Sequence, residues 1–207
     1  MATSEPELLS IPSARGPVRA LYHPPAATGP VVLMVGGFDG GFDGPADAIF
    51  QTLAEELASH GIGALRVDFR DRRSPGIVEA GARDVLAALA ELRRRGVPRF
   101  ALLGHSFGAA VMITVAAMTP DVAAVVALST QTAGATGAGR ISPRPLLLVH
   151  GLEDQRLSPD CSRYVYAIAG EPKELVLLEG ARHSLRQRRE DLRRLVLDWL
   201  VEKLRAA

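Results

Sequence analysis

Residues 100–111 read FALLGHSFGAAV, and this stretch decides the fold of the chain. Its apolar start predicts a buried strand, and helical periodicity begins near Phe107. Between the two stands Gly104-His105-Ser106-Phe107-Gly108, a Gly-X-Ser-X-Gly pattern that is typical of a sharp turn from a strand into a helix. Glycines on both sides leave room where larger side chains would collide. The stretch therefore predicts an α/β protein in which the hydroxyl of Ser106 is a candidate nucleophile.

The rest of the chain alternates short apolar runs with longer segments of helical periodicity. The runs are rich in Val and Leu without polar alternation, which predicts parallel strands covered by helices on both faces. We expect these strands at 31–35, 63–69, 100–103, 122–128, 145–149 and 175–178. We expect helices at 46–60, 77–95, 107–118 and 158–169, and a long C-terminal helix that buries Leu192, Leu195, Val196 and Trp199. Two less apolar stretches, 7–11 and 18–22, predict an edge hairpin.

The length of 207 residues and the absence of a Pro- or Ser-rich linker predict one domain over residues 1–207. Within it, residues 1–22 are expected to lead into the sheet as edge strands and residues 31–204 to form the core. Residues 130–139 contain only Thr, Ala, Gly and one Gln, which predicts a flexible loop between two strands. No internal repeat is present in the sequence.

Composition excludes several classes of partner. The net charge of +1 gives no strong field for nucleic acid or a membrane surface. The single cysteine, Cys161, excludes an internal disulfide framework and a thiolate-rich metal site. No apolar stretch approaches the roughly 18 residues of a membrane span, and the first 15 residues lack the pattern of a secretory signal. We expect a cytoplasmic protein with a small-molecule substrate.

A serine nucleophile needs an acid and a histidine after it in the chain, each in a loop at the carboxyl end of a strand. His150-Gly151-Leu152-Glu153-Asp154 follows the apolar run 145–149, and Glu179-Gly180-Ala181-Arg182-His183 follows the run that ends at Leu178. Because the carboxyl ends of parallel strands meet at one edge of a sheet, the two loops are expected to converge on Ser106.

These motifs resemble those of the α/β-hydrolase family, from about Val31 to Leu204. The H-G-x-x-D sequence followed by Arg156, Leu157 and Pro159 is similar to the acid loop of dienelactone-hydrolase-like members. The G-x-x-H sequence before a final amphipathic helix is similar to the histidine loop of the family. The chain departs from the dienelactone hydrolases themselves in the nucleophile, because they usually carry cysteine where this chain has serine.

The resemblance implies the α/β-hydrolase fold, with a mostly parallel sheet of about seven or eight strands and helices on both faces. It also implies a catalytic triad of Ser106, Asp154 and His183. Glu153, one residue before the expected acid position, is the alternative acid. For His105, inside the elbow, packing or loop hydrogen bonding is the simpler interpretation. The same interpretation applies to His150, at the end of a strand.

An oxyanion hole needs two backbone N–H groups, one of them from the residue after the nucleophile. Here that residue is Phe107. By resemblance to the H-G-x turn of the family, the second donor is the N–H of Phe38 in Val35-Gly36-Gly37-Phe38-Asp39-Gly40-Gly41, with Asp39 as the alternative. The rival interpretation, a phosphate-binding loop, lacks the G-x-x-x-x-G-K-[ST] spacing.

A charged cluster, Arg70-Asp71-Arg72-Arg73, follows another expected strand. It is either a substrate-binding site for a carboxylate or phosphate, or an ordinary solvated loop. Asp68, just before the cluster, is expected to anchor that loop.

The predicted activity is hydrolysis of an ester-like bond, most simply a carboxylester, through an acyl-enzyme on Ser106. Thioesterases, acyltransferases, peptidases and haloperoxidases share the triad, and a silent hydrolase-like binding protein is the non-enzymatic alternative. The sequence has no H-E-x-x-H and no histidine pair at helical spacing, so no metal and no cofactor are expected. Many members of the α/β-hydrolase family carry a lid domain after the strand that here ends at Leu128, but only a short loop separates Ser129 from Pro143. The resemblance therefore implies an open pocket without a lid domain.

Overall fold

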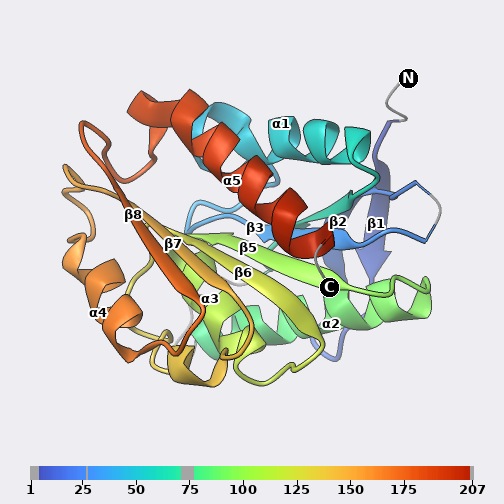
Figure 1. Cartoon of the computed structure of the whole chain (residues 1–207). Helices are drawn as coiled ribbons and strands as arrows, with labels where there is room; N and C mark the ends of the chain where they lie inside the picture. The colour runs from blue at the N-terminus through green and yellow to red at the C-terminus, as the bar shows by residue number, and fades with distance from the viewer. Residues whose placement is uncertain (1–4, 27, 71–76, 206–207) are drawn as a thin grey trace.

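The computed structural model describes residues 5–26, 28–70 and 77–205, and its centre is a sheet of eight strands. The strands are β1 (Glu7–Ile11), β2 (Val18–His23), β3 (Val31–Val35), β4 (Gly63–Asp68), β5 (Phe100–His105), β6 (Val122–Leu128), β7 (Leu146–Gly151) and β8 (Lys173–Leu178). They lie in the order β1-β2-β4-β3-β5-β6-β7-β8 (Figure 1).

The pairing of the strands follows their burial. From β4 to β8 along the sheet every neighbouring pair is parallel, whereas β2 is antiparallel to both β1 and β4. Every residue of β3 and β5 is buried, as expected for strands covered on both faces, while β1 at the edge is mostly exposed. The predicted mostly parallel sheet with an edge hairpin is therefore confirmed.

Helices cover both faces of the sheet. One face carries α1 (Pro45–Ser59) and α5 (Arg189–Arg205); the other carries α2 (Ile77–Arg94), α3 (Phe107–Ala116) and α4 (Asp160–Ile168). Figure 1 shows α1 and α5 above the sheet and α2 and α3 below it. No helix in the described part of the chain is both long and apolar enough to cross a membrane.

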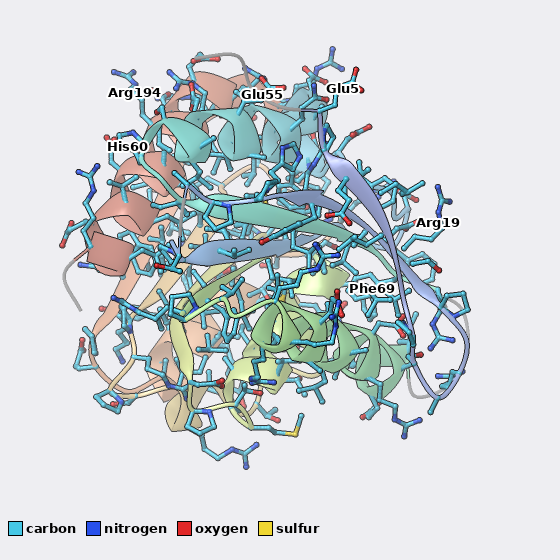
Figure 2. The ribbon with its side chains drawn as sticks, turned by 90° about the vertical axis from the view of Figure 1, so that its right-hand side faces the viewer. Glu5, Arg19, Glu55, His60, Phe69 and Arg194 are labelled. Atoms are coloured by element: carbon cyan, nitrogen blue, oxygen red, sulfur yellow. The ribbon has the colours of Figure 1, made fainter. Side chains whose placement is uncertain are left out.

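Helices α1, α2 and α5 each bury one stripe of apolar side chains, whereas α3 is buried on nearly all sides. Helix α1 buries Ile49, Phe50, Leu53 and Leu57, the stripe that its periodicity predicts. Trp199 of α5 is a core residue as expected, 5% exposed, with its Nε1 donating a hydrogen bond of 2.7 Å to Glu174 Oε1. The outer faces are charged, and Figure 2 shows Glu55 of α1 and Arg194 of α5 on that side.

The segment 130–139 is more ordered than its composition predicts. Ala135 and Ala138 are fully buried, and the second of them begins a short 3-10 turn that ends at Arg140. The hydroxyl of Thr114 on α3 donates to the carbonyl of Gly134, which holds the segment on the helix. Small side chains such as alanine can pack closely against a neighbouring helix, so the segment buries part of its surface despite its composition.

The sheet brings four loops to one edge. The carboxyl ends of β3, β5, β7 and β8 lead into the glycine loop, the serine turn, the acid loop and the histidine loop. Along the sheet each of these four strands is next to the following one or separated from it by a single strand, and all of them run parallel, so their carboxyl ends lie at the same edge. This edge carries the residues described next.

Candidate active site

Ser106 lies on the turn between β5 and α3 in a backbone conformation that is rare for a residue with a side chain. Its φ is 57° and its ψ is −120°, a strain that costs on the order of 1–3 kcal/mol. The N–H of Ser106 donates a hydrogen bond of 2.8 Å to the carbonyl of Leu128 on β6, which fastens the turn to the neighbouring strand. The strained turn presents the side chain at the edge of the sheet.

Both glycines of the turn are required by close contacts. A Cβ at Gly104 would lie 2.5 Å from the carbonyl oxygen of Gly108, and a Cβ at Gly108 would lie 2.2 Å from the carbonyl oxygen of Gly36. These distances are far below van der Waals contact. The start of α3 is therefore packed directly on the glycine loop after β3.

Replacing Gly108 with alanine is expected to lower the free energy of unfolding by about 3 kcal/mol, because the new methyl group meets backbone that cannot move away. Thermal and urea denaturation measure the loss. Gly36→Ala is the matched control for stability, since its Cβ would lie no closer than 3.5 Å to other atoms. Equal stability of the two variants would contradict the packing of α3 on the glycine loop.

His183 connects the serine turn with the acid loop. Its Nε2 lies 3.0 Å from Ser106 Oγ, and its Nδ1 lies 2.7 Å from Asp154 Oδ2. The acid loop is tied to the histidine loop by the N–H of Glu153, which donates to the carbonyl of Ala181 at 3.0 Å. The three residues named by the sequence thus form one chain of hydrogen bonds across three loops.

Asp154 is held as a buried carboxylate. Its Oδ1 accepts the N–H groups of Arg156 at 2.8 Å and Leu157 at 3.0 Å, and the residue is only 8% exposed. Burial acts to raise the pKa of Asp154, but the hydrogen bonds from Leu157, His183 and Arg156 outweigh it, so the pKa lies below its ordinary value. Asp154 therefore stays ionised at neutral pH.

The alternative residues occupy other places. Glu153, the alternative acid, is exposed. Further along the chain, Asp160 forms an exposed ion pair of 2.7 Å with Arg163. His105 lies beneath the histidine loop, where its Nε2 is 3.0 Å from the carbonyl oxygen of His183. Burial lowers the pKa of His105 to about 4, so its ring is neutral and donates to that carbonyl. Its role is to hold the loop, as the sequence suggested.

The glycine loop turns back over Ser106. The N–H of Gly40 donates to the carbonyl of Gly37 at 3.1 Å, a turn that leaves the N–H of Phe38 outside this hydrogen bond. A Cβ at Gly37 would lie 3.3 Å from Ser106 Cβ, so the loop approaches the serine closely. Asp68 at the end of β4 fixes the far side of the loop, since its Oδ1 accepts the N–H of Gly41 at 2.8 Å.

A cavity of about 400 Å³ opens in front of Ser106. Its walls come from the glycine loop, the start of α1, the serine turn and the histidine loop, and none of its lining residues belongs to the segment between β6 and β7. Phe38 stands half-exposed at the mouth, with its ring edge-on to Phe107 at 6.4 Å. Charged side chains surround the opening: Asp39, Asp47, Arg156 and Arg186.

The start of α1 forms the opposite wall in an unexpected conformation. Ala46, Asp47 and Ala48 all have positive φ, between 51° and 64°, so the predicted helix begins with a left-handed turn. Such a turn costs roughly 1–2 kcal/mol per residue. Two arginines that follow the histidine loop stabilise this turn. Arg189 donates a hydrogen bond of 3.1 Å to the carbonyl of Ala46, and Arg186 forms an ion pair of 2.8 Å with Asp47.

Arg70, the first residue of the charged cluster, has a structural role. Its Nη2 lies 2.8 Å from Oδ1 of Asp84, a residue of α2 that is only 2% exposed. The N–H of Arg70 donates to the other oxygen of the same carboxylate at 3.1 Å. The remaining cluster residues, Asp71, Arg72 and Arg73, lie outside the described residues.

Replacing Arg70 with alanine is expected to lower the free energy of unfolding by about 2–3 kcal/mol, because it leaves a buried carboxylate without its cation. The KM for an ester substrate is expected to stay unchanged, which separates this role from substrate binding. Arg163→Ala, which removes an exposed ion pair, is the control and is expected to cost less than about 1 kcal/mol. A raised KM without loss of stability would contradict the structural role.

Among residues 5–26, 28–70 and 77–205, no group of three or more His, Cys, Asp or Glu side chains is arranged to hold a metal ion. Ser106, Asp154 and His183, predicted from the sequence, lie together in the structure. Asp68 was expected to anchor the loop after β4, and its contact with the glycine loop was not predicted, although an acidic residue at the carboxyl end of a strand was a usable signal. The left-handed turn was not predicted either, because alanine-rich sequence offers no signal for it.

Comparison with known proteins assigns the family. The sequence matches the alpha/beta hydrolase family over residues 31–145, more than half of the chain, and the chain therefore belongs to this family of hydrolases. The match includes the serine turn and the glycine loop and ends before Asp154 and His183. No curated protein sequence matches the chain.

Solved structures share the fold at low sequence identity. Est1E from Butyrivibrio proteoclasticus is 17% identical with a TM-score of 0.83, and a dienelactone hydrolase from Anabaena variabilis is 18% identical with a TM-score of 0.80. The esterase domain of a Rhodothermus marinus protein is 20% identical with a TM-score of 0.78. Each alignment covers 97% of this chain and 99% of the other.

Proposed function

We propose that the protein hydrolyses a small carboxylic ester through an acyl-enzyme on Ser106. The observation that carries the proposal is the unbroken row of hydrogen bonds from Ser106 Oγ through the ring of His183 to Asp154 Oδ2. In this proposal Ser106 is the nucleophile, His183 the base and Asp154 the orienting acid, and the three follow one another along the chain in the order serine, acid, histidine that is typical of α/β-hydrolases.

The proton positions follow from the neighbours of His183. Asp154 is ionised and only accepts, so Nδ1 of His183 carries a hydrogen and Nε2 is free to accept the proton of Ser106. As the serine oxygen attacks the ester carbonyl, His183 takes that proton and then gives it to the departing alcohol oxygen. A water molecule next attacks the acyl-enzyme, and His183 accepts and returns a proton in the same way.

The oxyanion hole is proposed to consist of the N–H groups of Phe107 and Phe38. The first lies at the start of α3, where the helix dipole favours negative charge. The second belongs to the turn from Gly37 to Gly40, which approaches Ser106 Cβ. Loss of one such donor commonly costs about 3 kcal/mol of transition-state stabilisation.

The cavity favours a small ester over a long acyl chain. Its volume of about 400 Å³ is at the small end of the usual range for ligand pockets, and none of the described residues that line it belongs to the segment between β6 and β7. The half-exposed ring of Phe38 offers one apolar surface beside the serine, whereas the rim is charged. We therefore propose a compact acyl group, with the alcohol part of the substrate reaching toward solvent.

A panel of short-chain and long-chain p-nitrophenyl esters, a thioester and a peptide amide tests this proposal. We expect hydrolysis of acetate and butyrate esters with kcat/KM falling steeply for longer chains. Faster hydrolysis of the thioester would assign the site to thioesterases. Transfer of the acyl group to an added alcohol, measured by product analysis, would assign it to acyltransferases, and no turnover of any substrate would contradict hydrolysis.

A further inference from the structure

His150 is a buried titratable side chain that the mechanism above does not use. It lies at the end of β7, is fully buried, and precedes Asp154 by four residues. Its Nε2 lies 3.0 Å from Asp154 Oδ2 and 3.1 Å from the carbonyl oxygen of Leu157. On the other side of the ring, Nδ1 lies 2.7 Å from the hydroxyl of Ser162, a fully buried residue of α4.

The neighbours of this ring determine where its proton lies. Both neighbours of Nε2 are acceptors, a carboxylate and a carbonyl oxygen, so Nε2 carries the hydrogen and donates. Nδ1 then carries no hydrogen and accepts a hydrogen bond from the hydroxyl of Ser162. Burial lowers the pKa of His150 more than its bonds to Leu157 and Asp154 raise it, so the ring stays neutral.

Asp154 therefore has a donor on every acceptor position of its carboxylate. Oδ1 accepts two backbone N–H groups, and Oδ2 accepts Nδ1–H of His183 and Nε2–H of His150. An ionised carboxylate offers about four such positions, so this one is saturated. These hydrogen bonds fix the side chain of Asp154. The negative charge on Oδ2 is stabilised by two imidazole donors, His183 and His150, and not by His183 alone.

We propose that His150, held by Ser162, is a positioning residue that fixes Asp154 Oδ2 against His183 and shares the charge of that oxygen. The inference rests on the proposed serine-hydrolase function. Without the donor from His150, Oδ2 would present more negative charge to His183 and would stabilise the protonated imidazole. The base would then stay protonated, and inactive, up to a higher pH.

His183 faces the same charged and titratable groups in the wild type and in every variant named below, apart from position 150 itself. These groups are Asp39, His105, Asp154, Arg156, Arg182 and Arg186. Differences between variants therefore report the removal of the His150 donor.

The dependence of kcat/KM on pH is the first measurement. For His150→Phe we expect the midpoint of the acid limb to move up by about half a pH unit and the plateau to fall about tenfold, the equivalent of one hydrogen bond to a charged group. His150→Gln keeps an N–H donor near the position of Nε2, so it is expected to restore the wild-type midpoint. Ser162→Ala, which only loosens the ring, is expected to lower the plateau by less.

Nitrogen-15 NMR of the histidine rings is the second measurement, and it needs no substrate. The wild type is expected to show His150 neutral with hydrogen on Nε2 at pH 7 and above, and His183 to titrate at a higher pH in His150→Phe than in the wild type. If the wild type neither hydrolyses esters nor reacts with a serine-directed probe, the proposed function fails while these ring titrations still test the contact of His150 with Asp154.

Three results would overturn the inference. One is a folded His150→Phe protein with the acid limb and the His183 titration of the wild type. Another is a His150→Gln protein that shifts as far as His150→Phe. The third is hydrogen on Nδ1 of His150. If His150→Phe does not fold, His150→Asn takes its place, because the shorter amide does not reach Oδ2 and the same shift is expected.

Discussion

Replacing Ser106 with alanine is expected to lower kcat for a short-chain ester by roughly 10⁴- to 10⁶-fold. The variant keeps the cavity and the backbone donors but lacks the oxygen that attacks the carbonyl. KM is expected to change little, because the methyl group of alanine does not obstruct the cavity. Steady-state kinetics with p-nitrophenyl acetate, corrected for hydrolysis in buffer, measure the loss.

The matched control is Ser59→Ala. Ser59 is an exposed serine at the end of α1, and its hydroxyl donates a hydrogen bond of 2.6 Å to the carbonyl of Glu56. Its kinetics are expected to equal those of the wild type. Full esterase activity in purified Ser106→Ala would contradict an acyl-enzyme on Ser106.

Replacing Asp154 with asparagine is expected to lower kcat about 10⁴-fold. The amide has one accepting oxygen in place of two, and its NH₂ group would face either backbone N–H groups or the two histidine rings. In the second case Nδ1 of His183 can no longer donate, so Nε2 carries the hydrogen and cannot accept the proton of Ser106. Kinetics at pH 7 to 9 measure the effect.

Asp160→Asn is the control for this substitution, because it removes an exposed carboxylate six positions further along the chain that pairs with Arg163 on the surface of α4. It is expected to keep wild-type kcat. If kcat of a folded Asp154→Asn protein falls only a few-fold, the acid must be another residue.

Much of the fold was predictable because its signals are local. The run of five apolar residues from Val31 to Val35, rich in valine, favours a covered strand, and the Gly-X-Ser-X-Gly turn marks the point where β5 ends and α3 begins. The parallel sheet then requires its loops to meet at one edge, which is why the loops of Asp154 and His183 could be expected beside Ser106.

The walls of the cavity were not predictable, because distant residues determine them. Ala46 and Ala48 favour a right-handed helix by intrinsic propensity, yet they form a left-handed turn that Arg189 holds from 143 positions away. Ala135 and Ala138 carried no local sign of burial, since the surface that covers them belongs to other segments. Such features depend on contacts that no local pattern encodes.

Intact-mass spectrometry after reaction with a fluorophosphonate detects an activated serine without knowledge of the substrate. We expect one adduct per chain on the wild type, located at Ser106 by peptide mapping, and none on Ser106→Ala. The Ser59→Ala control is expected to react like the wild type. No adduct on folded wild-type protein, or an adduct that persists in Ser106→Ala, would contradict the claim that Ser106, His183 and Asp154 form a working triad.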